Sequence, residues 1–413
     1  AENLFATLRE PLHLTLRERG FAKKRGIKFG TIIIGLYFCK CKKQYTFTIK
    51  YRTSMQRNKI SFKGQKIFVG IDVHKTTWEV AVLTESGLLR RHSQESSAKV
   101  LFDFLRKHYP DGEYHTVYES GFSGFATYYA LKEFGIECTI THAADVPTTQ
   151  YEEVMKTDRI DAEKLARALK NGEIKRPVYI REKDNIDDRA VIRIRKTIQK
   201  QLSGYKARVK HMLHCNGVEI PECYSKPSQY WSRAFITWLM KDVKLLSSTR
   251  RSLDLLIRQV EVIRGTLLEA TRELRKLSQT ERYKHRFELL MTIPGIGQHV
   301  SMCILTEVWD VDRFPNEKAF AHAMGLVPTC HDSGPHKSNG EQTFRGNRYL
   351  GPMIIEACWV AIHKDMGLGA CYAYHKQRSN PQKAIVRVAR RMSNIIYSVL
   401  KNDKAYEPYQ WDK

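Results

Sequence analysis

Residues 66–172 carry an ordered series of strand and helix patterns, and this order restricts the chain to few folds. Three strand patterns come first: KIFVGIDVHK (66–75), TWEVAVLTESG (77–87) and LLRRHSQE (88–95). Helix and strand patterns then alternate through SAKVLFDFLRKHY (97–109), HTVYES (115–120), GFATYYALKEFG (124–135), IECTITHA (136–143) and KTDRIDAEKLARALKNG (156–172). The series predicts three antiparallel strands followed by alternating helix and strand, which is the order of the RNase H-like fold.

Four carboxylates fall at chemically informative places in this series. Asp72 interrupts the apolar strand 66–75, and Glu119 closes the strand 115–120. A buried carboxylate needs partners or a metal. Asp158 and Asp161 lie three apart at the start of the last helix, so both face one side of it. In the expected fold the four side chains meet at one end of the sheet.

Two interpretations of the helical pair are open at this point. Asp158 could act as N-cap, with Asp161 at the third helical position, because acidic side chains satisfy unpaired N–H groups there. All four carboxylates could instead bind Mg²⁺ or Mn²⁺, and two such ions about 4 Å apart would hold both oxygens of a phosphoryl displacement. Their joint placement favours metal ligation, with capping as a compatible second role.

The net charge of +25 points to a polyanionic partner. Lys and Arg against Asp and Glu number 14 to 3 in residues 1–60, 16 to 17 in 61–180, 23 to 12 in 181–285, and 16 to 12 in 286–413. We take these four ranges as domains: a basic extension, a catalytic domain, a basic helical region and a C-terminal domain. The neutral second domain is therefore flanked by basic sequence.

Residues 1–54 lack a core-forming pattern, and Met55 opens a more ordinary sequence. We interpret this stretch as upstream read-through, with a flexible basic arm as the alternative. Its apolar run TIIIGLYF (31–38) is too short to span a bilayer, so we expect a cytoplasmic protein without membrane contact. Nine scattered cysteines show neither disulfide nor zinc spacing.

The helical region 181–285 contains two long amphipathic patterns separated by NGVEIPECYSKPSQYW (216–231). We expect paired helices, in the manner of a coiled coil, with basic outer faces for nucleic acid. Then LLMTIPGIGQHVSMCILTEV (289–308) predicts helix, tight turn and helix. This resembles a helix–hairpin–helix, in which Gly295 and Gly297 would let backbone N–H groups approach a DNA phosphate; an ordinary helical hairpin is the alternative. Residues 325–351 are polar and glycine-rich, and we expect an irregular loop.

Together GIDVHK, VYES, KTDRIDAEKLA, IPGIG, GLVP followed by DSG, and GNRYL resemble the insertion-sequence transposases that combine a RuvC-like DEDD domain with a C-terminal transposase domain. The resemblance covers about residues 66–400. It implies an α/β plus α architecture and a DEDD set of Asp72, Glu119, Asp158 and Asp161. Members of this family are bridge-RNA-guided recombinases, which implies donor and target DNA, a guide RNA, and a homo-oligomer, dimer to tetramer, as partners.

The family uses a serine nucleophile from its C-terminal domain, and the matching position is Ser333 in CHDSGPH. Metal-held carboxylates could activate such a hydroxyl at a DNA phosphate. From the residues alone Ser333 and Gly334 would simply form a turn. Ser338 is the second candidate, and Lys337, Arg345 and Arg348 are candidate phosphate contacts.

Three functions remain open on the sequence. The first is a metal-assisted serine recombinase. The second is a metal-dependent endonuclease of the Holliday-junction type, in which water attacks the phosphate. The third is a nucleic-acid-binding scaffold with inactive carboxylates. The family resemblance favours the first.

Overall fold

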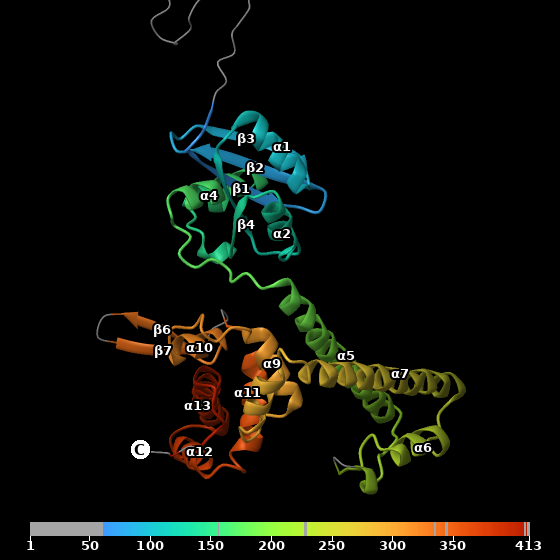
Figure 1. Ribbon diagram of the computed structural model, residues 1–413. Coiled ribbons are helices and arrows are strands. Elements are labelled where there is room, and N and C mark those ends of the chain that lie inside the picture. Colours follow the sequence, from blue (N-terminus) through green and yellow to red (C-terminus); the bar gives the residue numbers. More distant parts are fainter. Residues whose placement is uncertain are drawn as a thin grey trace, which may run out of the picture. The chain divides into compact units, whose positions relative to one another are not determined.

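The computed structural model divides the chain into two compact units that join between Ile180 and Arg181 (Figure 1). It describes residues 61–155, 157–226, 229–333, 336–342, 346–408 and 410. For Tyr151, 328–333 and 336–342 it describes the backbone alone. The predicted extension, 1–60, lies outside these ranges. Within them, no helix is both long and apolar enough to cross a bilayer.

The first unit is built on a five-stranded mixed sheet. Its strands are β1 (Lys66–Val73), β2 (Thr77–Thr84), β3 (Leu89–Glu95), β4 (Glu113–Glu119) and β5 (Glu137–Thr141). Their order across the sheet is β3-β2-β1-β4-β5. The first three strands are antiparallel neighbours, and β4 and β5 run parallel to β1. The predicted strand series is therefore confirmed, and this topology is consistent with an RNase H-like domain.

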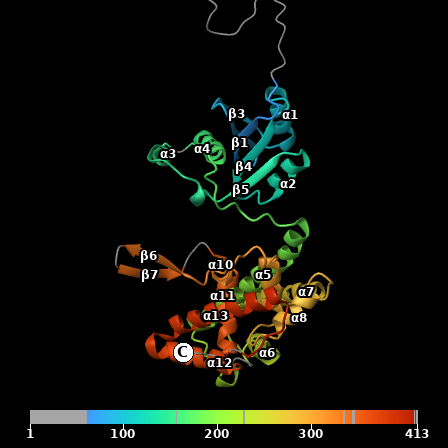
Figure 2. The same ribbon diagram turned by 60° about the vertical axis from the view of Figure 1, so that its left-hand side comes forward.

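Helices cover both faces of this sheet (Figure 2). These are α1 (Ala98–His108) and α2 (Ala126–Glu133) on one face and α4 (Asp158–Lys170) on the other; a 3₁₀ turn η1 (Ala143–Asp145) and a short helix α3 (Gln150–Val154) precede α4 in the chain. Leu101 and Leu105 of α1 and Leu131 of α2 are fully buried against one face of the sheet. On the other face α4 packs directly on β1 and β2.

Small residues allow α4 to lie very close to the sheet. Ala162 and Ala166 of α4 and Ala81 of β2 form a small buried cluster there. Gly70 of β1 completes the contact, because a Cβ at this position would lie 1.9 Å from the Ala162 carbonyl oxygen. The missing side chain at Gly70 therefore sets the distance between α4 and the central strand.

The start of α4 corrects one sequence interpretation. Thr157, rather than Asp158, is the N-cap: its backbone is extended and its side-chain oxygen accepts from the Ile160 N–H at 3.4 Å. Asp158 is the first helical residue and Asp161 the fourth. Neither carboxylate is needed for capping, although both still complement the positive end of the helix dipole.

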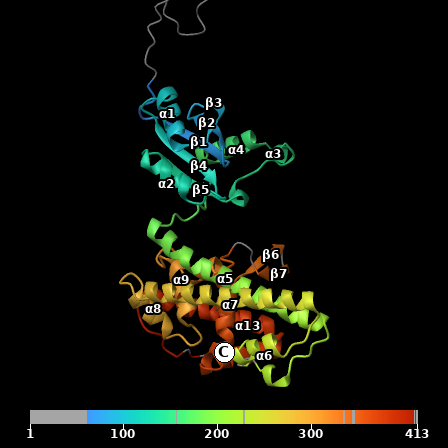
Figure 3. The same cartoon turned by 90° about the vertical axis from the view of Figure 1, so that its right-hand side faces the viewer.

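The second unit begins with two long helices that pack against each other (Figure 3). Its first elements are α5 (Lys183–Cys215), a 3₁₀ turn η2 (Glu222–Tyr224), α6 (Arg233–Lys241) and α7 (Ser247–Ser278). Contacts such as Arg195 with Thr271 show that α5 and α7 run antiparallel. Phe235 and Leu239 of α6 complete their shared core. A coiled-coil geometry for this pair stays a prediction.

The remaining helices share a core with those long helices. The remaining elements are α8 (Lys284–Met291), α9 (Gln298–Val308), α10 (Glu317–Ala323), β6 (Pro328–Ser333), β7 (His336–Gln342), α11 (Leu350–Ala361), α12 (Met366–Arg378) and α13 (Pro381–Asn402). Ile192 of α5 and Leu274 of α7 belong to the same hydrophobic cluster as α8, α9, α11 and α13. The expectation of an irregular loop over 325–351 was wrong, because β6 and β7 pair there as an antiparallel hairpin.

A buried charged cluster joins α5 to α9. Glu307 of α9 is 1% exposed, and it accepts hydrogen bonds from Arg193 at 2.8 Å and from Asn347 at 2.9 Å. Arg189 lies 2.9 Å from the same carboxylate, and Arg181 donates to the Glu307 carbonyl oxygen at 2.7 Å. Burial alone would raise the pKa of Glu307, but these arginines lower it to about 2.

Candidate active site

Two of the four predicted carboxylates lie on neighbouring parallel strands. Ile71 of β1 pairs with Tyr118 of β4, so Asp72 and Glu119 follow at the same end of the sheet. Both side chains are partly exposed. The sheet topology thus places them side by side, as the strand patterns predict.

The other two carboxylates come from the first turn of α4. Because Gly70 lets α4 approach β1 so closely, Asp158 reaches the side of Asp72, and Asp161 reaches the side of Glu119. The four carboxylates are nevertheless not one symmetric group. They form two pairs, and each pair is bridged by a basic side chain.

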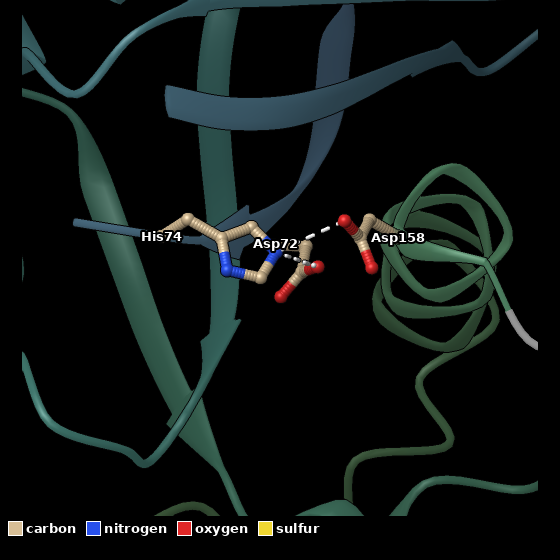
Figure 4. Close-up of side chains that lie close together, drawn as sticks. All are labelled: Asp72, His74 and Asp158. Carbon is tan, nitrogen blue, oxygen red and sulfur yellow. Dashed lines mark ion pairs between the residues drawn. The ribbon is translucent and has the colours of Figure 1, made fainter. Parts of the chain in front are cut away.

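His74 bridges the first pair (Figure 4). Its Nε2 lies 3.0 Å from Oδ2 of Asp72 and 3.2 Å from Oδ2 of Asp158. One ligand atom from each of these three residues lies within 4.8 Å of the other two. The ring belongs to the residue just after β1, so it lies over the end of the strand that carries Asp72.

Lys164 bridges the second pair. Its Nζ lies 3.1 Å from Oδ1 of Asp161 and 3.8 Å from Oε1 of Glu119. The Lys164 side chain is 9% exposed and that of Asp161 is 18% exposed. Lysine is seldom buried to this extent unless a carboxylate pairs with it, and here two carboxylates do.

The carboxylates influence one another electrostatically. Burial is the main reason why the pKa of the Asp72 carboxyl is raised. The His74 ring opposes this shift, and the negative charges of Asp158 and Asp161 add to it. Negative charge at this end of the sheet therefore needs compensation, which is the property of a cation-binding site.

The first pair has the donors that a divalent ion requires. Two carboxylate oxygens and one imidazole nitrogen, already within 4.8 Å of one another, suit Mg²⁺ or, with the nitrogen ligand, Mn²⁺. The residues of this site thus fit the predicted metal. The identity of that metal stays a prediction.

Sequence analysis missed His74 and Lys164. His74 is part of the motif GIDVHK, two residues after Asp72, and this short spacing at a strand end was a usable signal. Lys164 follows Asp161 by three positions, so the two side chains share one side of α4. A lysine on the same side of the helix as a predicted ligand indicates that one carboxylate pair is already compensated.

The predicted C-terminal residues are located only in part. Ser333 is the last residue of β6 and pairs with His336, and Lys337 and Ser338 of β7 pair with Asp332 and His331. The side chains of this hairpin lie outside the described part, as does Arg345 altogether. Their roles stay predictions, and so does phosphate binding by Arg348, which is exposed just before α11.

The predicted helix, turn and helix of residues 289–308 is present as α8 and α9. Gly295 has a positive φ of 85°, and a Cβ there would meet the Ala357 backbone of α11. Packing against α11 is therefore a sufficient reason for this glycine. Gly297 is the N-cap of α9 and has nothing within 4 Å of an added Cβ. Phosphate binding at this turn, as in a helix–hairpin–helix, stays a prediction.

Two protein families match this chain. The model of the DEDD transposase of IS110 matches residues 69–215, and the model described as the transposase IS116/IS110/IS902 family matches residues 287–373. The transposase for insertion sequence element IS1533 of Leptospira borgpetersenii is 23% identical over 348 residues, which are 82% of this chain and 96% of that protein. The putative transposase y4rJ of Sinorhizobium fredii is 25% identical over 318 residues, 71% of this chain and 80% of that protein.

A shorter match is to a protein named for gene inversion. The pilin gene-inverting protein of Moraxella bovis is 27% identical over 132 residues, 31% of this chain and 41% of that protein. The two family models together cover more than half of this chain, and the first one spans all four carboxylates. The chain therefore belongs to the IS110/IS116 family of insertion-sequence transposases and contains the DEDD domain of that family.

Proposed function

We propose that this transposase is a recombinase that cuts and exchanges DNA strands through a metal-assisted serine nucleophile. The observation that carries the proposal is the convergence of Asp72, Glu119, Asp158 and Asp161 at one end of the sheet, in a chain of transposase family. Asp72, His74 and Asp158 would hold a divalent ion. When bound, such an ion neutralises charge on a phosphate and lowers the pKa of a hydroxyl group beside it.

Ser333 supplies the nucleophile in this proposal. Its Oγ would form a bond to the phosphorus while the bond to one sugar oxygen breaks, leaving a phosphoserine link and a free sugar hydroxyl group. The serine proton passes to a nearby acceptor and the departing sugar oxygen takes up a proton. Attack by the freed hydroxyl group of another strand, with loss of its proton, reverses the step. The bond energy is conserved, as strand exchange requires.

A covalent protein–DNA adduct distinguishes this function from the endonuclease alternative. Enzyme incubated with Mg²⁺, guide RNA and labelled target DNA should yield an adduct on a denaturing gel. Ser333→Ala should bind DNA and form no adduct, and Ser338→Ala, five residues away in the same hairpin, should still form one. Cleavage by the unaltered protein without any adduct would favour attack by water. Loss of the adduct in Ser338→Ala alone would move the nucleophile to that serine.

The carboxylates and Ser333 belong to different compact units. We propose that one protomer supplies Ser333 and another the carboxylates, so that a dimer forms each complete site and two dimers exchange two duplexes. Mixing inactive Ser333→Ala with inactive Asp161→Ala should then restore adduct formation, because one mixed site contains both intact parts. If mixtures stay inactive while mixed oligomers form, the two parts act within one chain.

We also propose that a bridge RNA selects the DNA. Support comes from the resemblance to guided recombinases and from the basic residues of 181–285, where Lys and Arg outnumber Asp and Glu by 23 to 12. Pairing would then carry sequence information while the protein contacts backbone. Protein purified from cells that carry the intact element should retain an RNA from its noncoding flanks, and recombination should require it. Recombination by RNA-free protein would refute guidance.

A further inference from the structure

Lys164 and His74 occupy equivalent places in the two carboxylate pairs, yet their chemistry differs. A neutral imidazole nitrogen has a lone pair and is a common metal ligand. A lysine ammonium has three donors and no acceptor, so it cannot bind a cation. The His74 pair can therefore exchange its internal contacts for contacts to a metal, and the Lys164 pair cannot do so while the ammonium stays in place.

The surroundings hold that ammonium in place. The Lys164 side chain is 9% exposed, and its helix is fixed on β1 by the contact at Gly70. The ammonium lies 3.1 Å from a carboxylate oxygen of Asp161 and 3.8 Å from a carboxylate oxygen of Glu119. Moving the ammonium away would remove the Lys164 contact from two partly buried carboxylates, which is strongly unfavourable. A divalent ion placed between the same carboxylates would also meet the positive charge of Lys164.

We propose that Lys164 is a built-in cation of the DEDD site, and that it limits this site to one divalent ion, held by Asp72, His74 and Asp158. This inference rests on the proposed metal-assisted function and refines it. Lys164 is a positioning residue: it compensates Glu119 and Asp161 and keeps them oriented. The two-ion arrangement expected from four carboxylates is thereby replaced by one ion and one ammonium.

Counting bound Mn²⁺ tests the proposal without any DNA cleavage. The full chain is titrated with Mn²⁺, and the free ion is measured by electron paramagnetic resonance. Ions lost on Asp72→Asn or on Asp161→Asn, each made in the unaltered protein and in Lys164→Met, count as bound at the site, and all other ions count as weak binding elsewhere. We expect one such ion in the unaltered protein. Lys164→Met should gain a second, weaker ion, because Glu119 and Asp161 then lose the ammonium that lies beside them. Lys170→Met, with the same charge change on the same helix, should keep one.

A second set of variants keeps the test decisive if Lys164→Met does not fold. Asp158→Asn should lose the ion, like Asp72→Asn. Asp161→Asn should keep the ion, with less than about a tenfold loss of Mn²⁺ affinity. Tenfold is the lower end of the loss that follows when a residue that supports the metal ligands, rather than a ligand itself, is changed. Lys164→Arg, which preserves the charge, should also bind one ion.

The outcomes separate this inference from the proposed function. Three results would overturn the role of Lys164 while leaving a metal site. They are two site-specific ions in the unaltered protein, an unchanged ion count in folded Lys164→Met, and an equal loss of Mn²⁺ affinity in Asp161→Asn and Asp158→Asn. Absence of any ion sensitive to Asp72→Asn would overturn the metal site and, with it, the role of Lys164.

Discussion

Replacing Gly70 by alanine should separate the two halves of the active site, although Gly70 makes no contact with any of the four carboxylates. An added Cβ would lie 1.9 Å from the Ala162 carbonyl oxygen, and real Cβ atoms essentially never come within 3.0 Å of such an atom, so α4 must retreat by roughly 1 Å. Asp158 and Asp161 move with α4, whereas Asp72 and Glu119 stay on the sheet.

The size of the effect follows from this displacement. Forcing an extra methyl group into a packed contact typically costs about 1–3 kcal/mol of unfolding free energy. Metal ligands tolerate far less than 1 Å, and a displacement of that size at a reacting centre costs roughly 10²-fold in rate. We therefore expect Gly70→Ala to remain folded, to bind Mn²⁺ at least about tenfold more weakly, and to lose about 10²-fold of its recombination rate.

Urea unfolding, the Mn²⁺ titration and a recombination assay measure the three effects. Gly265→Ala is the matched control, because Gly265 lies in α7 with nothing within 4 Å of an added Cβ. It should stabilise the helix by about 0.5–1 kcal/mol and leave Mn²⁺ affinity unchanged. Adding Ala162→Gly should not rescue Gly70→Ala, because the clash is with a backbone oxygen. A Gly70→Ala protein with unaltered Mn²⁺ affinity would refute the reasoning.

Three further predictions concern other parts of the chain. Asp161→Ala should abolish recombination, measured with Mg²⁺, while leaving the unfolding midpoint and RNA binding largely intact; full activity would remove Asp161 from the site. Removing residues 1–54 should leave thermal unfolding and activity nearly unchanged, since the described core of the first unit begins at Phe62. Some loss of nucleic-acid affinity at low salt is expected. Failure of the shortened protein to fold would contradict this prediction. Burial, with Arg195 and Lys196 nearby, lowers the pKa of His299 to about 4, so between pH 6.5 and 4 the unfolded chain binds more protons and stability should fall as pH falls. Urea midpoints at pH 7 and pH 5 should differ less in His299→Asn than in the unaltered protein, and an equal difference would exclude this histidine as the cause.

The strands, the helices α1, α2 and α4 of the first unit and the end of the sheet where the carboxylates meet were predictable because apolar periodicity reports directly on burial. The hairpin of β6 and β7 was not, since residues 328–342 have no alternation of apolar and polar side chains. Thr157 and Asp158 are both good N-cap residues, and sequence pattern cannot choose between neighbours. The bridges made by His74 and Lys164 depend on side-chain placement at a helix–strand contact, which periodicity does not specify.

The compensation of Glu307 by arginines of α5 affects how the protein folds during synthesis and which of its parts can be exchanged with those of a relative. During translation α5 is made more than a hundred residues before Glu307, so its arginines cannot contact that carboxylate until α9 has been made. A fragment that begins at residue 286 would lack these cations, and removing one partner of a buried ion pair costs about 3–5 kcal/mol. Chimeras with a relative should therefore be joined between Ile180 and Arg181, because α5 and the glutamate that it neutralises then come from the same parent protein.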